Sequence, residues 1–431
     1  MMGRKIRMLI VTLVVASLFI MVSMGSVFAQ QTTLTVWWWQ HWPNCMGPAI
    51  DDFLEQNPDI TLEQTVMGTG DVYDSLFLAL AAGAGTPDIV ALESSYIGKF
   101  VEVGGLADIT DKISPWIDKM DPSKWADMTN RKGKICGMPV DSGPVAIWYR
   151  RDVFEQAGLP SDPESVAELL DTWDDYYEVA KIIKAKTNKY MLPLAKANYD
   201  FRIFEILLWQ QEAGYVDREG KLNINNPEAV RILEYLGKFW KEDLALDAGG
   251  WSTGWYAGLT DGEVATLPEA TWMGGCFANW ICPETAGLWG VVPLPVWEEG
   301  GVRSSNDGGS NIAITAASEN KEAAWKFIEF LFTNPDYMID AWRREDWFPS
   351  LILTYDDPFV DEVAPITGQA HRRIFADAAQ IIPWWVYTPD YAEMNSIMQI
   401  YVSAYALGDI ESAEEALAQT ATEITVRTGR E

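Results

Sequence analysis

The sequence predicts an α/β fold with at least two lobes. Strand and helix patterns alternate between residues 33 and 92, which is typical of a parallel sheet with helices on its faces. About 400 residues follow an apparent export signal, and one hydrophobic core rarely supports a chain of that length. Neither an internal repeat nor a long low-complexity linker interrupts the chain. The lobes are therefore expected to be compact and joined by short crossings.

The first elements follow one another at the pace of strand–helix–strand units. In chain order we expect strand 33–39, loop 40–44, helix 48–56, strand 60–66, helix 71–82 and strand 87–92. Asn57-Pro58 ends the first of these helices, and Gly83-Ala84-Gly85 ends the second. Because no Lys-Ser or Lys-Thr pair follows these glycines, they do not form a phosphate-binding loop.

Longer helices follow after residue 140. We expect helices 166–186, 201–213 and 227–243, a loop-rich aromatic region 249–297, strand 312–315, helix 321–332 and two final helices that begin near Tyr391 and Ser412. The helix 321–332 has the spacing of an amphipathic helix. This change of rhythm is consistent with a second lobe whose helices are longer than those of the first.

The amino-terminal residues have the features of a secretory signal peptide. Basic residues precede an apolar run at 8–22, and Val27 and Ala29 occupy the small-residue positions that signal peptidase reads. The alternative is a retained membrane anchor, since residues 9–29 just reach the roughly 20 apolar residues that a span needs. The positive start and the polar residues after Ala29 favour cleavage there. The mature protein is therefore expected to be periplasmic or extracellular.

The composition excludes some classes of partner. Removing residues 1–29 leaves 29 basic residues against 62 acidic ones, a net charge of −33. Such a chain is repelled by phosphate backbones and anionic headgroups, so neither nucleic acid nor a membrane surface is expected as a partner. Acidity also keeps an exported protein soluble, so the charge by itself indicates no particular function.

Cysteine and histidine are too sparse and too poorly spaced for a zinc site. The chain has 4 Cys and 2 His, and no pair has zinc-ligand spacing, so neither a metal nor a cofactor is expected. In an exported protein we expect Cys276 and Cys282, which are close in sequence, to form a disulfide. Pairing of Cys45 with Cys136 is a weaker expectation, and free thiols are its alternative.

Tryptophan is unusually frequent, with 21 residues. Most are expected to be core residues. The remainder matter because an indole face stacks on the apolar C–H face of a pyranose and leaves the sugar hydroxyls free for hydrogen bonds. The composition therefore favours a sugar ligand over a cationic solute.

Five segments in order along the chain are similar to landmarks of one known family. They are LALAAGAGTPDIV at 78–90 with GGLADIT at 104–110, GMP at 137–139 with IWYRRDVF at 147–154, DGEVA at 261–265 leading to Trp272, GGSNIAI at 308–314, and EAL at 415–417. Together they resemble the extracellular solute-binding proteins of carbohydrate importers, the group that includes maltose-binding proteins. The resemblance covers nearly the whole mature chain.

The resemblance implies a two-lobed periplasmic-binding-protein fold, with a hinge of two or three crossings and a ligand cleft. By this analogy one lobe takes residues 30–141 and 295–346, and the other takes 142–294 and 347–431. The protein would be a monomer that captures a sugar or oligosaccharide without altering it. Closure of the lobes over the ligand would create the shape that the membrane subunits of an ABC transporter recognise.

Strand ends supply one set of candidate ligand-binding residues, independently of the resemblance. Ligands in parallel sheets lie beyond the carboxyl ends of strands, which selects Trp39, Gln40 and His41 after the first strand. Glu93 ends a buried apolar run, where an unpaired carboxylate is costly, and Asp141 follows the strand that enters the first crossing. Core packing is the alternative for Trp39, and loop packing for His41.

A second set rests mainly on the resemblance. The family often places a stacking aromatic where Trp272 stands, and site residues in the turn that holds Asp71. Helix capping is the alternative for Asp71. Trp255 flanks the same landmark as Trp272, and simple cover over the lobe is its alternative.

The crossings supply three further candidates. Asp307 precedes a glycine pair that ends at Gly309, and the missing side chains let the backbone approach a ligand closely. A turn explains these glycines equally well. Trp347 lies at the proposed third crossing and is a candidate to line the cleft.

Two other functions remain open at this stage. An exported glycoside hydrolase would also show aromatic platforms and needs two carboxylates roughly 5–10 Å apart. A binding protein for a non-sugar solute, such as a polyamine, a peptide or a metal chelate, is the other alternative. The absence of a Gly-x-Ser-x-Gly elbow argues against a nucleophilic triad.

Overall fold

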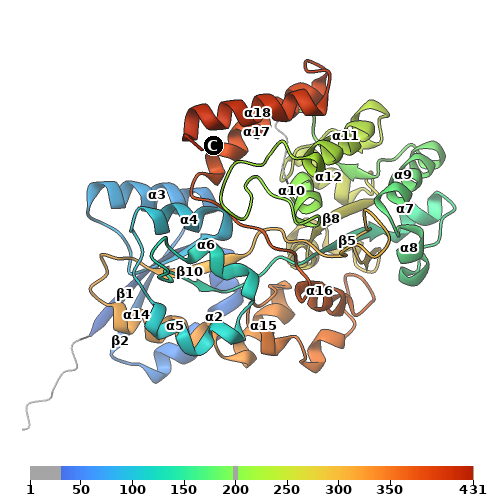
Figure 1. The fold of residues 1–431 in the computed structure, drawn as a ribbon. Helices are drawn as coiled ribbons and strands as arrows, with labels where there is room; N and C mark the ends of the chain where they lie inside the picture. Colours follow the sequence, from blue (N-terminus) through green and yellow to red (C-terminus); the bar gives the residue numbers. More distant parts are fainter. Residues whose placement is uncertain (1–30, 198–201, 431) are drawn as a thin grey trace, which may run out of the picture.

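The structure, a computed structural model, describes residues 31–197 and 202–430 and consists of two lobes that lie side by side (Figure 1). The predicted signal peptide falls outside the described residues. Lobe one contains a five-stranded sheet in the order β2-β1-β3-β10-β4. Its strands are β1 (Thr32–Trp38), β2 (Ile60–Val66), β3 (Ile89–Glu93), β4 (Met138–Pro139) and β10 (Ser310–Ile314). The first three are parallel to one another, and β10 is antiparallel to both of its neighbours.

Helices cover both faces of this sheet. In Figure 1, α3 (Thr69–Ala82) and α4 (Ser94–Glu102) lie above it, and α2 (His41–Gln56), α14 (Lys321–Phe332) and α15 (Pro335–Glu345) lie below. The sheet is closed on both sides, which is why β3 and β10 consist almost wholly of buried residues. The short helices of this lobe are α5 (Thr110–Ile113), η1 (Ser114–Lys119), η2 (Pro122–Lys124) and α6 (Trp125–Met128).

Lobe two is built on a three-stranded antiparallel sheet. Its order is β8-β5-β9, formed by β5 (Val145–Arg150), β8 (Thr266–Ala270) and β9 (Trp289–Val292). A separate parallel pair joins β6 (Leu192–Pro193) to β7 (Ala245–Leu246). Every residue of β5, β8 and β9 is buried, because helices surround the sheet.

The helices of lobe two pack mainly around this sheet. They are α7 (Arg151–Gln156), α8 (Pro163–Leu169), α9 (Trp173–Thr187), α10 (Arg202–Trp209), α11 (Pro227–Lys241), α12 (Thr253–Thr260), α13 (Met273–Cys276), the π-helical turn η3 (Phe277–Ile281), η4 (Pro283–Thr285), η5 (Ile352–Thr354), η6 (Pro358–Asp361), α16 (His371–Ala379), α17 (Tyr391–Leu407) and α18 (Ala413–Thr428). The last two pack on each other and on α11, at the top of Figure 1.

Three chain crossings join the lobes and are hydrogen-bonded to one another. The first crossing pairs with the second through Pro144 and Asn306, and with the third through Asp141 and Pro349. Gly143 is essential to this contact, because a Cβ there would collide with the carbonyl group of Asp307. The hinge is therefore a small three-stranded bundle whose strands cannot slide independently.

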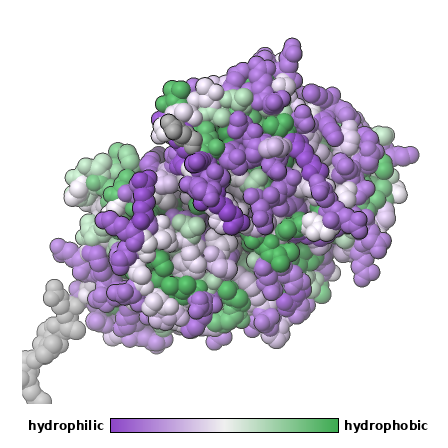
Figure 2. All heavy atoms as spheres, in the orientation of Figure 1, coloured by the Kyte–Doolittle hydropathy of each residue, from purple (hydrophilic) through white to green (hydrophobic). Residues whose placement is uncertain are grey.

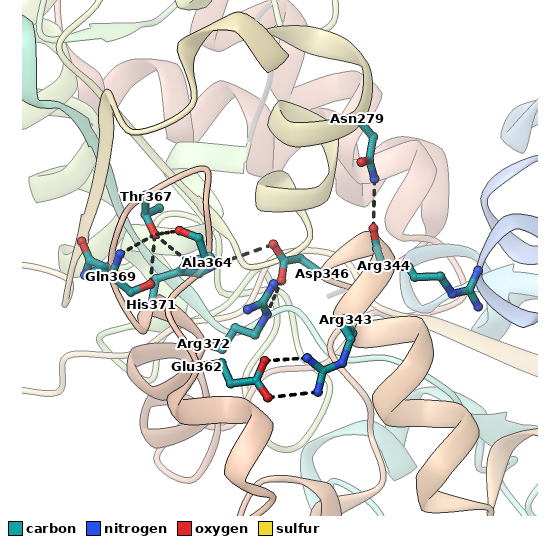
Figure 3. A network of polar contacts seen from close by, with 10 residues as sticks. All are labelled: Asn279, Arg343, Arg344, Asp346, Glu362, Ala364, Thr367, Gln369, His371 and Arg372. Carbon is teal, nitrogen blue, oxygen red and sulfur yellow. Dashed lines mark hydrogen bonds and ion pairs between the residues drawn. The ribbon is translucent and has the colours of Figure 1, made fainter.

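A buried polar network holds the third crossing in place (Figure 3). Asp346 accepts a hydrogen bond from Arg372 Nε at 2.6 Å and lies 3.5 Å from His371 Nε2. Burial opposes the charge of Asp346, but the bonds and charges of His371 and Arg372 hold its pKa below the usual value. On the far side of the ring, His371 Nδ1 lies 2.9 Å from Thr367 Oγ1. The carboxylate thus ties the end of α15 to α16 in lobe two.

The sequence-based elements differ from the structure in several places. The region 249–297, expected to be loop-rich, contains the helix α12 and the strands β8 and β9 of the lobe-two sheet. Residues 41–44 form the first turn of α2 instead of a loop. The single helix expected at 166–186 is two helices, because Thr172 forms a capping box with Asp175 that starts a new one. The sheet of lobe one is also not wholly parallel, since β10 enters it from the second crossing in the opposite direction.

The expected disulfide between Cys276 and Cys282 is wrong for this structure. All four cysteines, which lie within the described residues, are free thiols. The π-helical turn η3 separates Cys276 from Cys282 in the chain. Cys282 is a core residue of lobe two, and Cys276 is partly buried against the same core; burial, and then the negative charges of Glu269 and Glu345, raises the pKa of the Cys276 thiol to about 12. The weaker pairing of Cys45 with Cys136 is absent as well.

The surface agrees with the acidic composition. Figure 2 shows that hydrophilic side chains cover most of the visible face, with a greener patch over α3. Phe77 and Leu78, which are 44% and 67% exposed, contribute to this patch. No helix within residues 31–197 and 202–430 combines the length and apolar character that a bilayer crossing requires.

Candidate ligand-binding site

Lobe one contributes a half-buried carboxylate flanked by two tyrosines. Glu93 is the last residue of β3, and its backbone N–H donates to Tyr73 Oη at 3.3 Å. The rings of Tyr73 and Tyr96 stack, with centroids 4.1 Å apart. Burial, and next the negative charge of Glu93, raises the pKa of both tyrosine hydroxyls, which therefore stay protonated. The three side chains offer the donors and acceptors that sugar hydroxyls require.

Lobe two contributes an arginine that reaches toward the same place. Arg202 is the first residue of α10 and forms an ion pair with Asp307 in the second crossing. Its positive charge partly opposes the rise in pKa that burial and Glu93 cause in Tyr73 and Tyr96, so it lies near the tyrosines of the other lobe. Arg202 therefore lies between the tyrosines of lobe one and Asp307 in the second crossing. We call Tyr73, Glu93, Tyr96, Arg202, Glu269, Trp272 and Asp307 the interlobe site.

Glu269 lies beside Asp307 and Arg202, and we call these three residues the floor of the site. Glu269 in β8 and Asp307 are 6% and 2% exposed. Burial, then the negative charge of Asp307 and a hydrogen bond to it, raises the pKa of Glu269 well above its ordinary value. Among the described residues, no amide, hydroxyl or cationic donor reaches the buried Asp307 Oδ2. We conclude that Glu269 is protonated and donates to Asp307, so that the two acids and Arg202 together carry no net charge.

Trp272 stands beside this floor. Its Nε1 donates to the carbonyl oxygen of Asp307 at 3.3 Å, and its ring is half-buried. Trp251 lies parallel to it, with ring centroids 5.8 Å apart. Trp255, the other tryptophan predicted from this region, is only 4% exposed and lies behind Trp251 at 5.2 Å. Trp255 supports the aromatic wall from within, and its contact with a ligand stays a prediction.

The three residues predicted at the end of β1 lie in different environments. Gln40 is exposed, and its amide bonds to Asn44 at 3.0 Å. Trp39 is half-buried and packs edge-on against Trp42, with centroids 5.5 Å apart. His41 lies 3.3 Å from Cys45 Sγ, and burial lowers the pKa of its ring to about 4. The imidazole is therefore neutral near pH 7.

Asp141 and Gly309 belong to the hinge in this structure. Asp141 is 3% exposed and accepts from Ser310 N at 2.9 Å, and burial raises its pKa to about 6 although the charge of Lys124 opposes the rise. Gly309 has a φ of +93°, and a Cβ there would collide with Lys124 Nζ. Lys124, fully buried, donates to Ser94 Oγ at the start of α4. These residues link the first two crossings to lobe one, and direct ligand contact stays a prediction.

Two further predicted residues lie apart from the interlobe site. Asp71 is exposed in the first turn of α3, and the helix begins at Thr69, so Asp71 is not its N-cap. Trp347 is 2% exposed and packs against Trp42 with centroids 5.1 Å apart. A role for either side chain in binding stays a prediction.

The sequence reasoning missed five residues of this region. They are Tyr73, Tyr96, Arg202, Trp251 and Glu269. Only Glu269 carried a usable signal, because it is the sole charge in a buried strand and the argument used for Glu93 applies to it equally. The others come together through contacts between segments distant in sequence.

Comparison with known proteins identifies the family. Residues 46–338 match the bacterial extracellular solute-binding protein family. The chain belongs to this family. It is 30% identical to the arabinooligosaccharide-binding protein of Bacillus subtilis (strain 168), over 75% of this chain and 74% of that protein. It is also 30% identical to the lactose-binding protein of Rhizobium radiobacter, over 79% of this chain and 77% of that protein.

Solved structures agree on the fold of this solute-binding protein. The binding protein associated with an ABC transporter of B. animalis subsp. lactis Bl-04, in complex with β-1,6-galactobiose, superposes with a TM-score of 0.77. The two share 24% identity, and the match covers 92% of this chain and 97% of the other. The predicted two-lobed fold is confirmed.

The comparisons also separate the functions left open by the sequence. The family and its named relatives are binding proteins. They support the prediction of a sugar-capturing component of an ABC-type importer over the alternative of an exported hydrolase. The family is extracellular, which agrees with the expected export.

Proposed function

We propose that this solute-binding protein holds a neutral oligosaccharide at the interlobe site and delivers it to the membrane subunits of an ABC-type importer. The observation that carries the proposal is the neutral, hydrogen-bonding floor beside an indole face. The carboxylate of Asp307 is balanced by Arg202, and Glu269 is protonated. Trp272 lies beside this floor with its ring half open.

This arrangement favours uncharged sugars over acidic ones. A sugar acid would need a cation to balance its carboxylate, yet Arg202 is already paired with Asp307. Glu93 lies beside Tyr73 and Ser95 and would repel a second anion. The hydroxyls of a neutral sugar instead find charge-assisted acceptors on Glu93 and donors on the two tyrosines.

The relatives support a pentose- or galactose-containing ligand. Proteins 28–30% identical over most of their length are named for arabino-oligosaccharides and for lactose. We therefore place arabino-oligosaccharides and galactosides first among the candidate ligands.

The lobes are assigned from their hydrophobic cores. One core draws on buried residues from Leu34 to Val140 and from Ile312 to Leu351. The others draw on the intervening chain and the carboxyl-terminal part. The cores support the first boundary of the proposed division, which gives lobe one residues 30–141 and 295–346 and lobe two residues 142–294 and 347–431. Trp297 packs on a lobe-two core, and Trp347 and Leu351 belong to the lobe-one core, so we place the other two boundaries several residues later. The exported protein acts as a monomer whose lobes close over the sugar.

No catalytic step is proposed. Thr367, His371 and Asp346 follow one another as hydroxyl, imidazole and carboxylate, the order used in nucleophilic catalysis. All three are buried, at 1%, 0% and 4% exposure, so a substrate has no access to them. At the interlobe site, Glu269 interacts directly with Asp307, whereas a hydrolytic carboxylate pair stands roughly 5–10 Å apart on either side of the glycosidic bond.

A ligand screen tests the proposal. Thermal melts of the mature protein would be recorded with arabino-oligosaccharides, lactose, malto-oligosaccharides and, as the charged comparison, oligogalacturonates. A ligand present at 100 times its Kd stabilises the folded state by about 2.7 kcal/mol. We expect a rise in Tm with a neutral sugar and none with the acidic one. A response to the acidic sugar alone, or new reducing ends after incubation, would overturn the proposal.

A further inference from the structure

Three indoles stand in succession along the wall of lobe two. The rings of Trp272 and Trp251 are 5.8 Å apart with planes inclined by 20°, and those of Trp251 and Trp280 are 6.2 Å apart with planes inclined by 17°. Near-parallel rings at these separations are offset, so each leaves part of its face uncovered. We call Trp272, Trp251 and Trp280 the indole row.

The outer part of the row is open to solvent. Trp251 is 42% exposed and Trp280 is 54% exposed, and they are the two most exposed tryptophans in the chain. By contrast Trp38, Trp148 and Trp289 are completely buried. Exposing two large indoles next to each other is unfavourable in water, which calls for an explanation other than core packing.

The backbone at Trp251 departs from what a bulky residue prefers. Its φ is +62°, in the left-handed region where glycine is the unstrained choice. Gly249 and Gly250 precede it directly. Ser252 then caps α12 by accepting from Trp255 N at 3.2 Å, so the turn is held from the helix side. An indole kept in a strained position and pointed outward indicates a functional contact.

The turn that carries Trp280, at the other end of the row, is bonded to α15 through Asn279. Trp280 lies in the π-helical turn η3, next to Asn279. The amide of Asn279 donates to the carbonyl oxygen of Arg344 at 3.1 Å and to Glu345 Oε2 at 2.9 Å, part of which Figure 3 shows. The row therefore runs from Asp307 in the second crossing to the junction of lobe two with α15.

We propose that the interlobe site continues along the indole row, so that the ligand is an oligosaccharide with at least one sugar unit for each of the three indoles. The inner unit contacts Trp272, and the following units contact Trp251 and Trp280. The inference rests on the proposed function and deepens it by assigning ligand length to Trp251 and Trp280. Offset indoles suit a chain of pyranose or furanose rings because each ring presents its own C–H face.

The test compares ligand length in single variants. Calorimetry would measure arabino-oligosaccharides of two, three and four units with the wild-type protein, Trp280→Ala and Trp251→Ala. Trp116→Ala is the matched control, because Trp116 is a half-buried tryptophan of lobe one that bonds to Glu329, away from the row. If an alanine variant does not fold, Trp280→Phe or Trp251→Phe takes its place, because phenylalanine retains an aromatic ring at that position.

We expect wild-type affinity to rise with length. Trp280→Ala should weaken binding of the tri- and tetrasaccharide by about 3–10-fold and leave the disaccharide within about twofold. Trp251→Ala should weaken both classes, the phenylalanine variants should lie between, and Trp116→Ala should match wild type. Ligand should also protect Trp280 from acrylamide quenching, measured as the difference between wild type and Trp280→Phe.

Two other results have distinct meanings. Equal losses at every length in Trp280→Ala, or no loss at any length, would overturn the indole row as a length-reading surface. Absence of binding to wild type by every neutral sugar in the screen would instead overturn the proposed function itself.

Discussion

Replacing Glu269 with Gln tests the proton that Glu269 shares with Asp307. Glutamine has the same shape, and its amide still donates to Asp307 Oδ2, but it does not titrate. In the wild-type protein burial raises the pKa of Glu269 above its unfolded value. Between these two pKa values the unfolded chain has lost its proton and the folded chain has kept it. The free energy of unfolding therefore falls as pH rises through that interval.

The size of the effect follows from one proton. While pH lies between the unfolded and folded pKa values, Glu269 lowers the free energy of unfolding by about 1.4 kcal/mol per pH unit. Asp127, Asp141 and Glu205 also have raised pKa values, and they add similar slopes above their unfolded values. Those slopes are common to both proteins. The difference between Glu269→Gln and wild type therefore isolates Glu269.

Urea unfolding at pH 5, 6, 7 and 8 measures this difference. We expect Glu269→Gln to gain stability relative to wild type as pH rises from 5, with little difference at pH 5. Glu269→Ala should instead lose about 1–3 kcal/mol at pH 5, because Asp307 Oδ2 is then buried without a donor. A variant that keeps the pH slope of wild type would refute the shared proton.

Three further changes test other parts of the site. Trp272→Ala should weaken sugar binding by about 1–3 kcal/mol in calorimetry with an unchanged circular dichroism spectrum, and Trp272→Phe should recover part of the loss; lost folding would show a core role instead. Glu93→Gln should weaken binding about tenfold, since a charge-assisted acceptor becomes a neutral one, and an unchanged Kd would place Glu93 outside the site. Gly143→Ala should lower the free energy of unfolding by about 1–3 kcal/mol, because its Cβ collides with Asp307, whereas Gly47→Ala, which meets no atom within 4 Å, should not.

The parts of the fold that were predictable are those set by local sequence. The helix Lys321–Phe332 was predicted with the bounds that the structure has, because its apolar spacing is clear and a loop precedes it. The strand Ile60–Val66 was predicted equally well. In both cases the residues that determine the element lie within a few positions of it.

The start of α2 was not predictable for the opposite reason. Gln40 makes no side-chain cap there, and Pro48 lies inside the helix, so the local signals indicate a loop before residue 48. Arg344 of α15 donates to the carbonyl oxygens of Asn44 and Cys45. A contact between segments about 300 residues apart thus supports this turn, and no local pattern records it.

The candidate site shows the same division. Glu93 was found because a carboxylate at the end of a buried run needs a partner, and Glu269 satisfies that criterion as well. Tyr73 and Arg202 were missed because each lies on a helix whose sequence explains it without a ligand. They come close to each other only through the packing of one lobe against the other, which local sequence does not record.

Asp307 explains why the hinge and the site are coupled. Its backbone N–H donates to the carbonyl oxygen of Gly143 at 2.8 Å, which joins the second crossing to the first. Its own carbonyl oxygen accepts from Trp272, and its carboxylate binds Arg202 and Glu269. A rotation of the lobes about the crossings must therefore move the Trp272 ring and the ion pair together. A sugar that contacts both will favour one hinge angle over others, which is the physical requirement for a ligand to select the closed form.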